Sequence, residues 1–207
     1  MLSEKDFKRI VREMDKLKNQ DAVDFLRKTS PWFDPLEKTV IRAAAFLKSL
    51  DVFYLFYGLR ALPLYGVPYI SSEILFAVKS DGRRLNDLLS GSQFRKLLET
   101  PEESRILDLQ SNKVIKFIHS PAPLNWDEEI VERALEKNGV KIASTEDYVI
   151  SLLASSSSTM RLELAAKTIY SNLDEMDLQY LEERAERFSV WEKIRSLIDG
   201  LRNVVNR

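Results

Sequence analysis

The sequence predicts an α+β protein in which a small mixed β-sheet is flanked by helices toward both ends of the chain. Three stretches of the chain, which differ in the spacing and type of their apolar residues, support this prediction. Apolar residues recur at helical spacing in residues 1–50, short runs of aromatic and β-branched residues follow in residues 51–143, and helical spacing returns in residues 144–207. We therefore expect an N-terminal helical region packed on an α/β core, and a C-terminal helical region after it.

Three helices are predicted in the first region. Apolar side chains recur through residues 7–17 with charged residues between them, which indicates an amphipathic helix. A shorter helix is expected over residues 21–27, because Pro31 follows closely. A third helix is expected to begin near Asp34 and Pro35, where an N-cap residue precedes proline at the first helical position.

Strands and one helix are predicted in the first part of the core. Residues 52–56 and 73–78 are rich in aromatic and β-branched side chains, which favours strands. Leucines at helical spacing predict a helix over residues 83–98. Residues 105–110 and 113–119 are expected to form the two strands of a hairpin.

The remainder of the chain is predicted to be mostly helical. A helix over residues 127–137 is expected to stop at Gly139, and residues 140–143 form a short strand. The capping-box-like run at residues 144–147 begins another helix, and residues 155–158 form a loop. Further helices are expected at residues 160–170, 178–188 and 190–205.

Composition excludes several kinds of site and partner. The 207 residues include no cysteine, so disulfides, thiolate metal ligands and cysteine nucleophiles are excluded. The formal net charge of −1 gives no global positive field and so does not support a nucleic-acid partner. Residues 1–20 lack the apolar centre of a secretory signal, and the apolar residues 52–64 are interrupted by Arg60 and Pro63. We expect a cytoplasmic protein with no membrane partner.

One segment, residues 57–78, carries the most specific pattern. It contains a glycine turn at Gly58, a short helical or irregular stretch, a second turn at Gly66-Val67-Pro68, and then a strand. This order resembles the opening motif of the polymerase-β-like nucleotidyltransferases, especially the minimal, AbiEii-like branch of type IV abortive-infection toxins. In that family the motif is Gly-Gly-x-Ala-Leu, then Gly-Val-Pro-Arg, then a strand with Asp-x-Asp. Residues 127–147 and 178–190 resemble later parts of the same family.

The resemblance implies a metal-dependent reaction that moves a nucleoside monophosphate from a triphosphate to a hydroxyl. Divalent metal ions stabilise the attacking and leaving oxygens, and Mg²⁺ prefers carboxylate ligands. The family therefore places two acids at i and i+2 on one strand, where they share a face, and a third acid on a neighbouring strand. The glycine turn lets backbone N–H groups approach the phosphates.

Several positions of this pattern are changed in the chain. Glu73 corresponds to the first acid, but Leu75 occupies the position of the second. Counting back from residue 127 places Lys116 near the third acid, with Asp108 the acid on the adjoining strand. Further departures are Tyr57 for the first glycine, Tyr69 for the arginine after Gly-Val-Pro, Leu152 for a basic residue, and Leu162 and Ala165 for an acidic pair.

These changes lead to a set of candidate site residues. The catalytic and metal-binding candidates are Glu73 and Asp108, with Mg²⁺ as the cofactor if the protein is active, and the nucleotide-binding candidates are Gly58 and Lys116. Structural roles stay open for three of them: Glu73 as a solvated residue at a strand start, Gly58 as a turn residue with positive φ, and Asp108 as a surface residue of the hairpin.

Two other features carry both a functional and a structural interpretation. Lys79, Arg83, Arg84, Arg95 and Lys96 form a basic zone that is either a solvated helix face or a contact for phosphate or RNA. The chain's single histidine, His119, is expected to be a hydrogen-bonded structural residue.

Three functions are compatible with the sequence. The first is a nucleotidyltransferase-fold protein with a degenerate site that binds a protein partner or a nucleotide, related to toxin–antitoxin systems. The second is an active, toxin-like nucleotidyltransferase that modifies RNA or protein. The third is a structural or homo-oligomerising protein whose N-terminal helices form the interface, an interpretation supported by the amphipathic stripe at residues 7–17.

Overall fold

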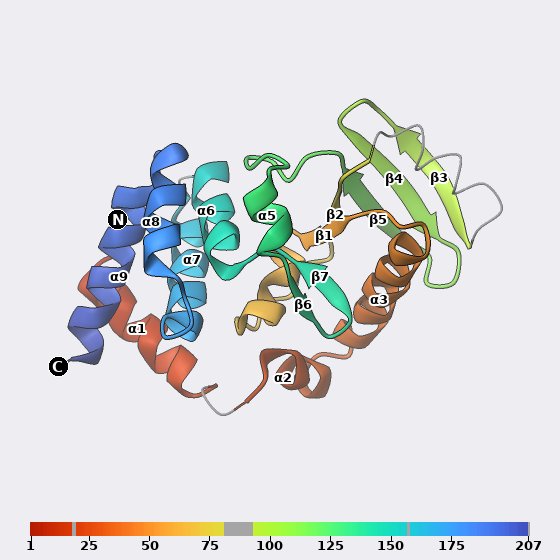
Figure 1. Cartoon of the computed structure of the whole chain (residues 1–207). Coiled ribbons are helices and arrows are strands. Elements are labelled where there is room, and N and C mark those ends of the chain that lie inside the picture. Colours follow the sequence, from red (N-terminus) through yellow and green to blue (C-terminus); the bar gives the residue numbers. More distant parts are fainter. Residues whose placement is uncertain (18–19, 81–92, 157, 207) are drawn as a thin grey trace. The chain divides into compact units, whose positions relative to one another are not determined.

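A computed structural model describes residues 1–17, 20–80, 93–156 and 158–206, with only the backbone of Pro35 (Figure 1). The chain divides into two compact units. A helical unit comprises Met1–Phe25, Leu62–Pro68 and Ser144–Arg207, and a sheet unit comprises Leu26–Ala61 and Tyr69–Ala143. A mixed sheet with helices before and after it in the chain confirms the predicted α+β class.

The sheet unit contains a mixed sheet of seven strands within the described residues. Its strand order is β3-β4-β5-β2-β1-β7-β6, with parallel pairing between β2 and β5 and between β1 and β7, and antiparallel pairing elsewhere. The strands are β1 Tyr54–Tyr57, β2 Ile74–Val78, β3 Phe94–Glu99, β4 Glu103–Asp108, β5 Lys113–Ile118, β6 Leu135–Lys137 and β7 Val140–Ile142.

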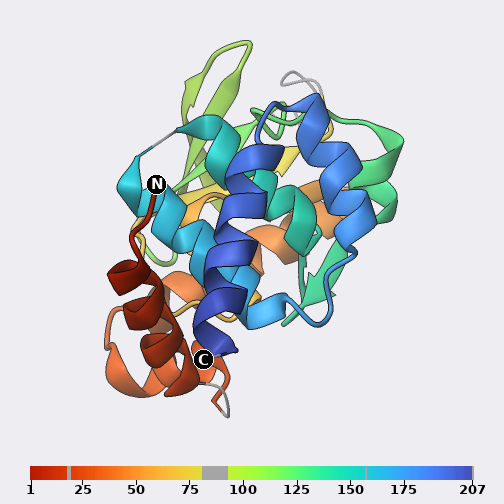
Figure 2. The same ribbon diagram turned by 90° about the vertical axis from the view of Figure 1, so that its left-hand side faces the viewer.

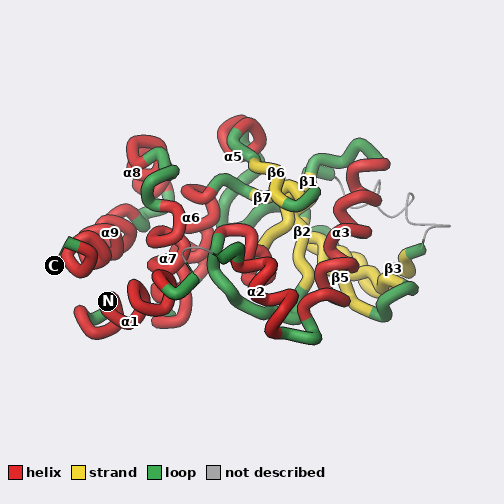
Figure 3. Tube along the Cα trace, turned by 90° about the horizontal axis from the view of Figure 1, so that it is seen from below, coloured by secondary structure: helices red, strands yellow, loops and turns green. Residues whose placement is uncertain are grey.

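One helix, α3 (Phe33–Ser49), packs on one face of this sheet (Figure 3). The ring of its Phe46 lies 5.0 Å from that of Phe94 in β3. Ile106 and Ile115 are fully buried and lie directly opposite each other in β4 and β5. Because side chains alternate along a strand, the residues next to Ile106 in β4 and next to Ile115 in β5 point to the opposite face of the sheet. That second face carries the candidate site.

The other segments of the chain near the sheet are short. The 3₁₀ helix η1 (Leu59–Tyr65) follows β1, and α5 (Glu128–Glu132) begins after Asp127, whose carboxylate accepts a hydrogen bond from the Ile130 N–H. Helix α2 (Ala22–Thr29) ends in the sheet unit, where Arg27 forms an ion pair with Glu37 at 2.8 Å.

Two predicted helices are wrong in part. Residues 93–98 were expected in a helix, but Phe94–Glu99 form the edge strand β3, because pairing with β4 and burial of Phe94 outweigh local helical spacing. The rest of that predicted helix, residues 83–92, lies outside the described residues. The helix expected over residues 127–137 ends at Glu132, and Leu135–Lys137 form β6.

A hairpin explains the second error. Asn138 and Gly139 connect β6 to β7 with φ values of 51° and 74°, as two-residue turns of the primed type require. Gly139 therefore turns a hairpin instead of ending a helix. The hairpin predicted for residues 105–110 and 113–119 is confirmed by the antiparallel pairing of β4 with β5.

The helical unit is built from helices at both ends of the chain (Figure 2). Helix α1 begins with a capping box, in which the Ser3 side chain and the Asp6 carboxylate each accept a hydrogen bond from the other's backbone N–H. The helical unit contains α1 Glu4–Asp15, α6 Thr145–Ser155, α7 Thr159–Asn172, α8 Leu178–Arg187 and α9 Trp191–Val205.

Helix α1 packs closely on α9. Phe7, Ile10 and Met14 are buried along one side of α1, as the predicted amphipathic stripe requires. A Cβ atom added to Gly200 of α9 would lie 2.4 Å from the Phe7 ring, so the ring occupies the space that any larger residue would need. The absence of a side chain at position 200 thus lets the two helices approach.

A buried ion pair links α6 to α8. Arg184 Nε donates a hydrogen bond of 3.0 Å to Asp147, and the Tyr180 hydroxyl and the Ser144 hydroxyl donate to the other carboxylate oxygen. Burial raises the pKa of Asp147, although the charge of Arg184 opposes that shift. Such a pair adds little net stability, because its attraction and hydrogen bonds mainly offset the cost of dehydrating two charges.

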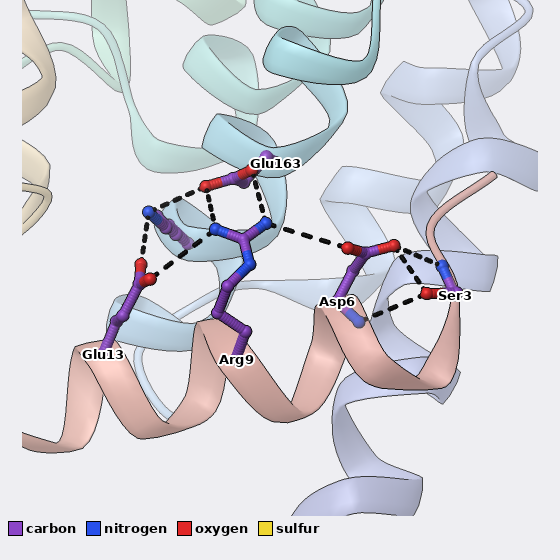
Figure 4. Close-up of polar contacts among 6 residues, drawn as sticks. Ser3, Asp6, Arg9, Glu13 and Glu163 are labelled. Atoms are coloured by element: carbon purple, nitrogen blue, oxygen red, sulfur yellow. Dashed lines mark hydrogen bonds and ion pairs between the residues drawn. The ribbon is translucent and has the colours of Figure 1, made fainter.

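A partly exposed ion-pair network joins α1 to α7 (Figure 4). The Arg9 guanidinium donates two hydrogen bonds, of 3.0 and 2.8 Å, to the two oxygens of Glu163. Lys167 contacts Glu163 at 2.9 Å and Glu13 at 2.8 Å. The hydrogen bonds from Arg9 and then Lys167 lower the pKa of Glu163 to about 2.

Within the described residues, none of the helices combines the length and the apolar character that crossing a membrane requires.

The lowered pKa of Glu163 predicts an acid-dependent contribution to stability. Its carboxylate stabilises the fold above the ordinary glutamate pKa, and this contribution is lost as the pH falls from 4.5 toward about 2. Glu163→Gln should therefore lower the free energy of unfolding at pH 7 by about 1 kcal/mol, with the difference from wild type narrowing below pH 4.5. Urea unfolding at several pH values measures the difference in the free energy of unfolding at pH 7 and its decrease below pH 4.5.

The matched control is Glu182→Gln, which removes an exposed carboxylate from α8. It should leave stability within about 0.5 kcal/mol of wild type at every pH. An equal loss in both variants, or a Glu163→Gln effect that does not change with pH, would contradict the network's role.

Candidate functional site

A row of side chains crosses four strands on the face of the sheet opposite α3. Tyr57 in β1 lies opposite Leu75 in β2, Leu75 lies beside Lys116 in β5, and Lys116 lies opposite Arg105 in β4. We call these four residues the cross-strand row. Directly paired residues in adjacent strands have Cβ atoms about 5 Å apart, so neighbouring side chains in the row are in reach of one another.

Gly58 follows directly after Tyr57 and borders this row. Its φ of 72° is a left-handed conformation that favours glycine. A Cβ atom at this position would lie 3.1 Å from Cδ2 of Leu75. The structure therefore brings two of the predicted site residues, Gly58 and Lys116, to opposite sides of Leu75.

Glu73, the candidate for the first acid, lies just before β2. It is exposed, its backbone N–H donates to the Ser71 hydroxyl at 3.3 Å, and its carboxylate forms no ion pair with any residue that the structure describes. Its position at the start of β2, two residues before Leu75, matches the order of the family motif.

Asp108, the second candidate metal ligand, lies on the other face of the sheet. It is fully buried, and Arg42 of α3 donates to one carboxylate oxygen through Nε at 3.1 Å and also through Nη2. The Ser111 hydroxyl donates to the same oxygen at 2.7 Å, and the Gln110 N–H donates to the other at 3.0 Å. Burial alone would raise the pKa of Asp108, but these hydrogen bonds outweigh it and lower that pKa.

The structure therefore does not bring Asp108 to the cross-strand row. Asp108 and Arg105 are three residues apart in β4, so their side chains point to opposite faces of the sheet. Asp108 is also a buried partner of α3 instead of the surface hairpin residue considered above. No group of three or more acidic or histidine side chains suited to a metal occurs in residues 1–17, 20–80, 93–156 and 158–206. A Mg²⁺ site of Glu73 and Asp108 stays a prediction, and this placement does not favour it.

An acid that the sequence reasoning missed joins the row. Glu103 at the start of β4 accepts hydrogen bonds from Arg105 Nε at 2.9 Å on one oxygen, and its other oxygen lies 2.6 Å from Lys116 Nζ. The hydrogen bond from Lys116, followed by those from Arg105, lowers the pKa of Glu103. The sequence does carry a signal for Glu103: it stands two residues before Arg105, and residues two apart in a strand share a face.

The predicted basic zone is described only in part. Arg83 and Arg84 lie outside the described residues. Arg95 pairs with Leu107 and so shares the face of the cross-strand row, whereas Lys96 pairs with Ile106 and forms an ion pair with Glu99 at 2.7 Å. The zone is thus not one helix face, since part of it belongs to strand β3.

His119 was expected to be a hydrogen-bonded structural residue. Its backbone carbonyl accepts a hydrogen bond of 2.9 Å from Trp126 Nε1. Both imidazole nitrogens are buried without a hydrogen-bond partner among the described residues. The ring therefore carries none of the side-chain hydrogen bonds that the prediction assumed.

The contrast between Asp108 and Glu73 gives a stability test. Asp108→Asn should lower the free energy of unfolding by about 3 kcal/mol, because it leaves the Arg42 guanidinium without its charged partner. Glu73→Gln, the matched control, should change stability by less than about 0.5 kcal/mol. Chemical denaturation measures both. Equal, small effects would contradict a structural role for Asp108.

Comparison with known proteins supports the fold. No protein-family model matches the sequence, and no curated protein matches it. Among solved structures, an antigenic nucleotidyltransferase-like protein from Paracoccidioides brasiliensis matches 82% of this chain and 93% of its own, with 18% identity and a TM-score of 0.52.

A second structure, JHP933 from Helicobacter pylori, covers 82% of this chain and 93% of its own at 15% identity, with a TM-score of 0.43. That score is too low to establish a shared fold. The first match, together with the mixed sheet and its flanking helices, shows that this chain has a nucleotidyltransferase-like fold.

Proposed function

We propose that this protein uses a nucleotidyltransferase-like fold to bind a nucleotide or a protein partner and does not catalyse metal-dependent nucleotidyl transfer. One observation carries the proposal. Leu75 and Lys116 lie side by side in β2 and β5, at the positions where the resemblance places the second and third acids. The scaffold of the site is retained while two of its three carboxylates are replaced.

Elementary electrostatics explains why these replacements matter. A leucine offers no oxygen ligand, so Glu73 would hold a metal ion without its partner on β2. A Mg²⁺ ion about 5 Å from the Lys116 ammonium would be repelled by roughly 7 kcal/mol at an effective dielectric constant of about 20. A carboxylate at this position would instead attract the ion, so the replacement of the third acid by Lys116 weakens any metal site to which Glu73 contributes a ligand.

The retained features favour binding. Gly58 keeps the turn that lets backbone N–H groups approach a phosphate, and Lys116 supplies a positive charge on the same face of the sheet. The order of motifs in residues 57–78 and 127–147 supports a relation to the AbiEii-like branch and hence to toxin–antitoxin systems. An active toxin-like transferase is the alternative that the following experiment separates.

Calorimetry and a pyrophosphate-release assay test the proposal. Wild-type protein with Mg²⁺ or Mn²⁺ and each nucleoside triphosphate should release no pyrophosphate, and Glu73→Ala should leave any nucleotide binding within about twofold of wild type, because Glu73 has no metal-binding partner on β2. Metal-dependent pyrophosphate release that disappears in Glu73→Ala would contradict the proposal and favour an active transferase.

A gain-of-function pair checks the assignment of positions. The double substitution Leu75→Asp with Lys116→Asp should create Mn²⁺ binding, because it restores carboxylates side by side on β2 and β5. The matched control, Leu75→Asn with Lys116→Asn, removes the same leucine and lysine without adding charge and should bind no Mn²⁺. Equal behaviour of the two double variants would show that these positions do not form the ancestral metal site.

A further inference from the structure

Two positive charges face each other across β4 and β5. Arg105 and Lys116 are direct partners in the antiparallel register. Like charges directly opposite in a sheet destabilise it, and an anion between the two side chains removes that cost. Glu103 supplies that anion, with one oxygen 2.8 Å from Arg105 Nη2 and the other 2.6 Å from Lys116 Nζ.

One carboxylate does not neutralise this cluster. Arg105 and Lys116 carry two positive charges against the single negative charge of Glu103. Arg95 lies on the same face, opposite Leu107, and adds a third positive charge from β3. The face of β3, β4 and β5 that points away from α3 is therefore positive overall within the described residues, although the chain as a whole has a formal net charge of −1.

The cations also keep donors that Glu103 does not use. An arginine has five N–H donors and a lysine three. Glu103 engages Nε and Nη2 of Arg105 and one direction of the Lys116 ammonium. The side chain of Arg105 remains 48% exposed, so its guanidinium stays accessible from solvent.

We propose that Arg105 and Lys116 form a metal-independent phosphate-binding site, and that the Glu103 carboxylate occupies the place of the phosphate when no ligand is bound. This inference rests on the proposed binding function and names the ligand class of that same face. A phosphate offers more acceptor oxygens and more charge than a carboxylate, and so satisfies both cations and their remaining donors.

A phosphate can displace the Glu103 carboxylate from Arg105 and Lys116. Glu103 lies at the first position of β4, and its side chain shows partial exposure, so it can turn toward solvent when a phosphate arrives. Its lowered pKa means that the carboxylate stays charged near neutral pH. Binding is then a competition between two anions for one pair of cations.

A calorimetric titration in metal-free buffer containing EDTA tests this proposal. Inorganic pyrophosphate is the probe. Glu103→Gln removes the competing charge and should bind pyrophosphate about tenfold more tightly than wild type, whereas Lys116→Gln should bind it about tenfold more weakly. Thermal melting of each variant confirms that it is folded.

The matched control is Lys113→Gln, on the same strand. Lys113 is exposed and pairs with Asp108, so its side chain belongs to the opposite face, and its loss should leave pyrophosphate affinity unchanged. The same affinity in wild type, Glu103→Gln and Lys116→Gln would overturn the proposal. An equal loss in Lys113→Gln and Lys116→Gln would also overturn it, because it would indicate attraction by general charge.

Further titrations separate the sources of the phosphate. ATP and a single-stranded RNA oligonucleotide are each compared between Glu103→Gln and Lys116→Gln. A difference with ATP identifies a nucleotide ligand, and a difference with RNA alone identifies the backbone of a nucleic acid strand. Because no metal is present, the result is independent of the pyrophosphate-release assay. If pyrophosphate does not bind at Arg105 and Lys116, the proposed binding function still stands with another ligand. If the release assay detects metal-dependent formation of pyrophosphate, the proposed binding function is wrong.

Discussion

The parallel pairing of β2 with β5 is the constraint on which the site depends. It places Leu75 beside Lys116, and the antiparallel partners on either side extend the row to Tyr57 and Arg105. Helix α3 covers the other face of the sheet. Because side chains alternate between the two faces along each strand, the register decides which side chains pack against α3 and which can contact a ligand. A slip of one residue in this register would exchange the two sets completely.

Much of the fold could be predicted from local pattern. Strands β1 and β2 coincide with aromatic and β-branched runs, because these side chains suit a pleated, half-buried surface, and β4, β5 and β7 overlap the other strands that the sequence predicts. The edge strand β3 could not be predicted, since Leu97 and Leu98 are exposed and only pairing with β4 defines the strand. The Asn138-Gly139 turn was present in the sequence, but the glycine alone was interpreted as a helix stop.

The site was partly predictable for a similar reason. Order and spacing were enough to suggest that Lys116 lies near the strand of Leu75, and the structure places them as direct neighbours. The face of Asp108 could not be deduced, because it depends on where α3 packs. Glu103 was missed because the predicted strand began at residue 105, which left this acid in a loop and hid its alternation with Arg105.

The packing of α1 has a consequence for how the chain folds. Its buried stripe faces α9, and its ion pairs reach α7, so α1 packs on segments that follow it by 154 residues or more, as Arg9 and Glu163 show. Before α7 and α9 are in place, Phe7, Ile10 and Met14 lack the apolar surface of α9, and α1 has only local support from the cap at Ser3 and from ion pairs such as Lys8 with Glu4. Folding of the helical unit therefore depends on contacts between distant parts of the chain, and such contacts form slowly because closing a long loop costs conformational entropy.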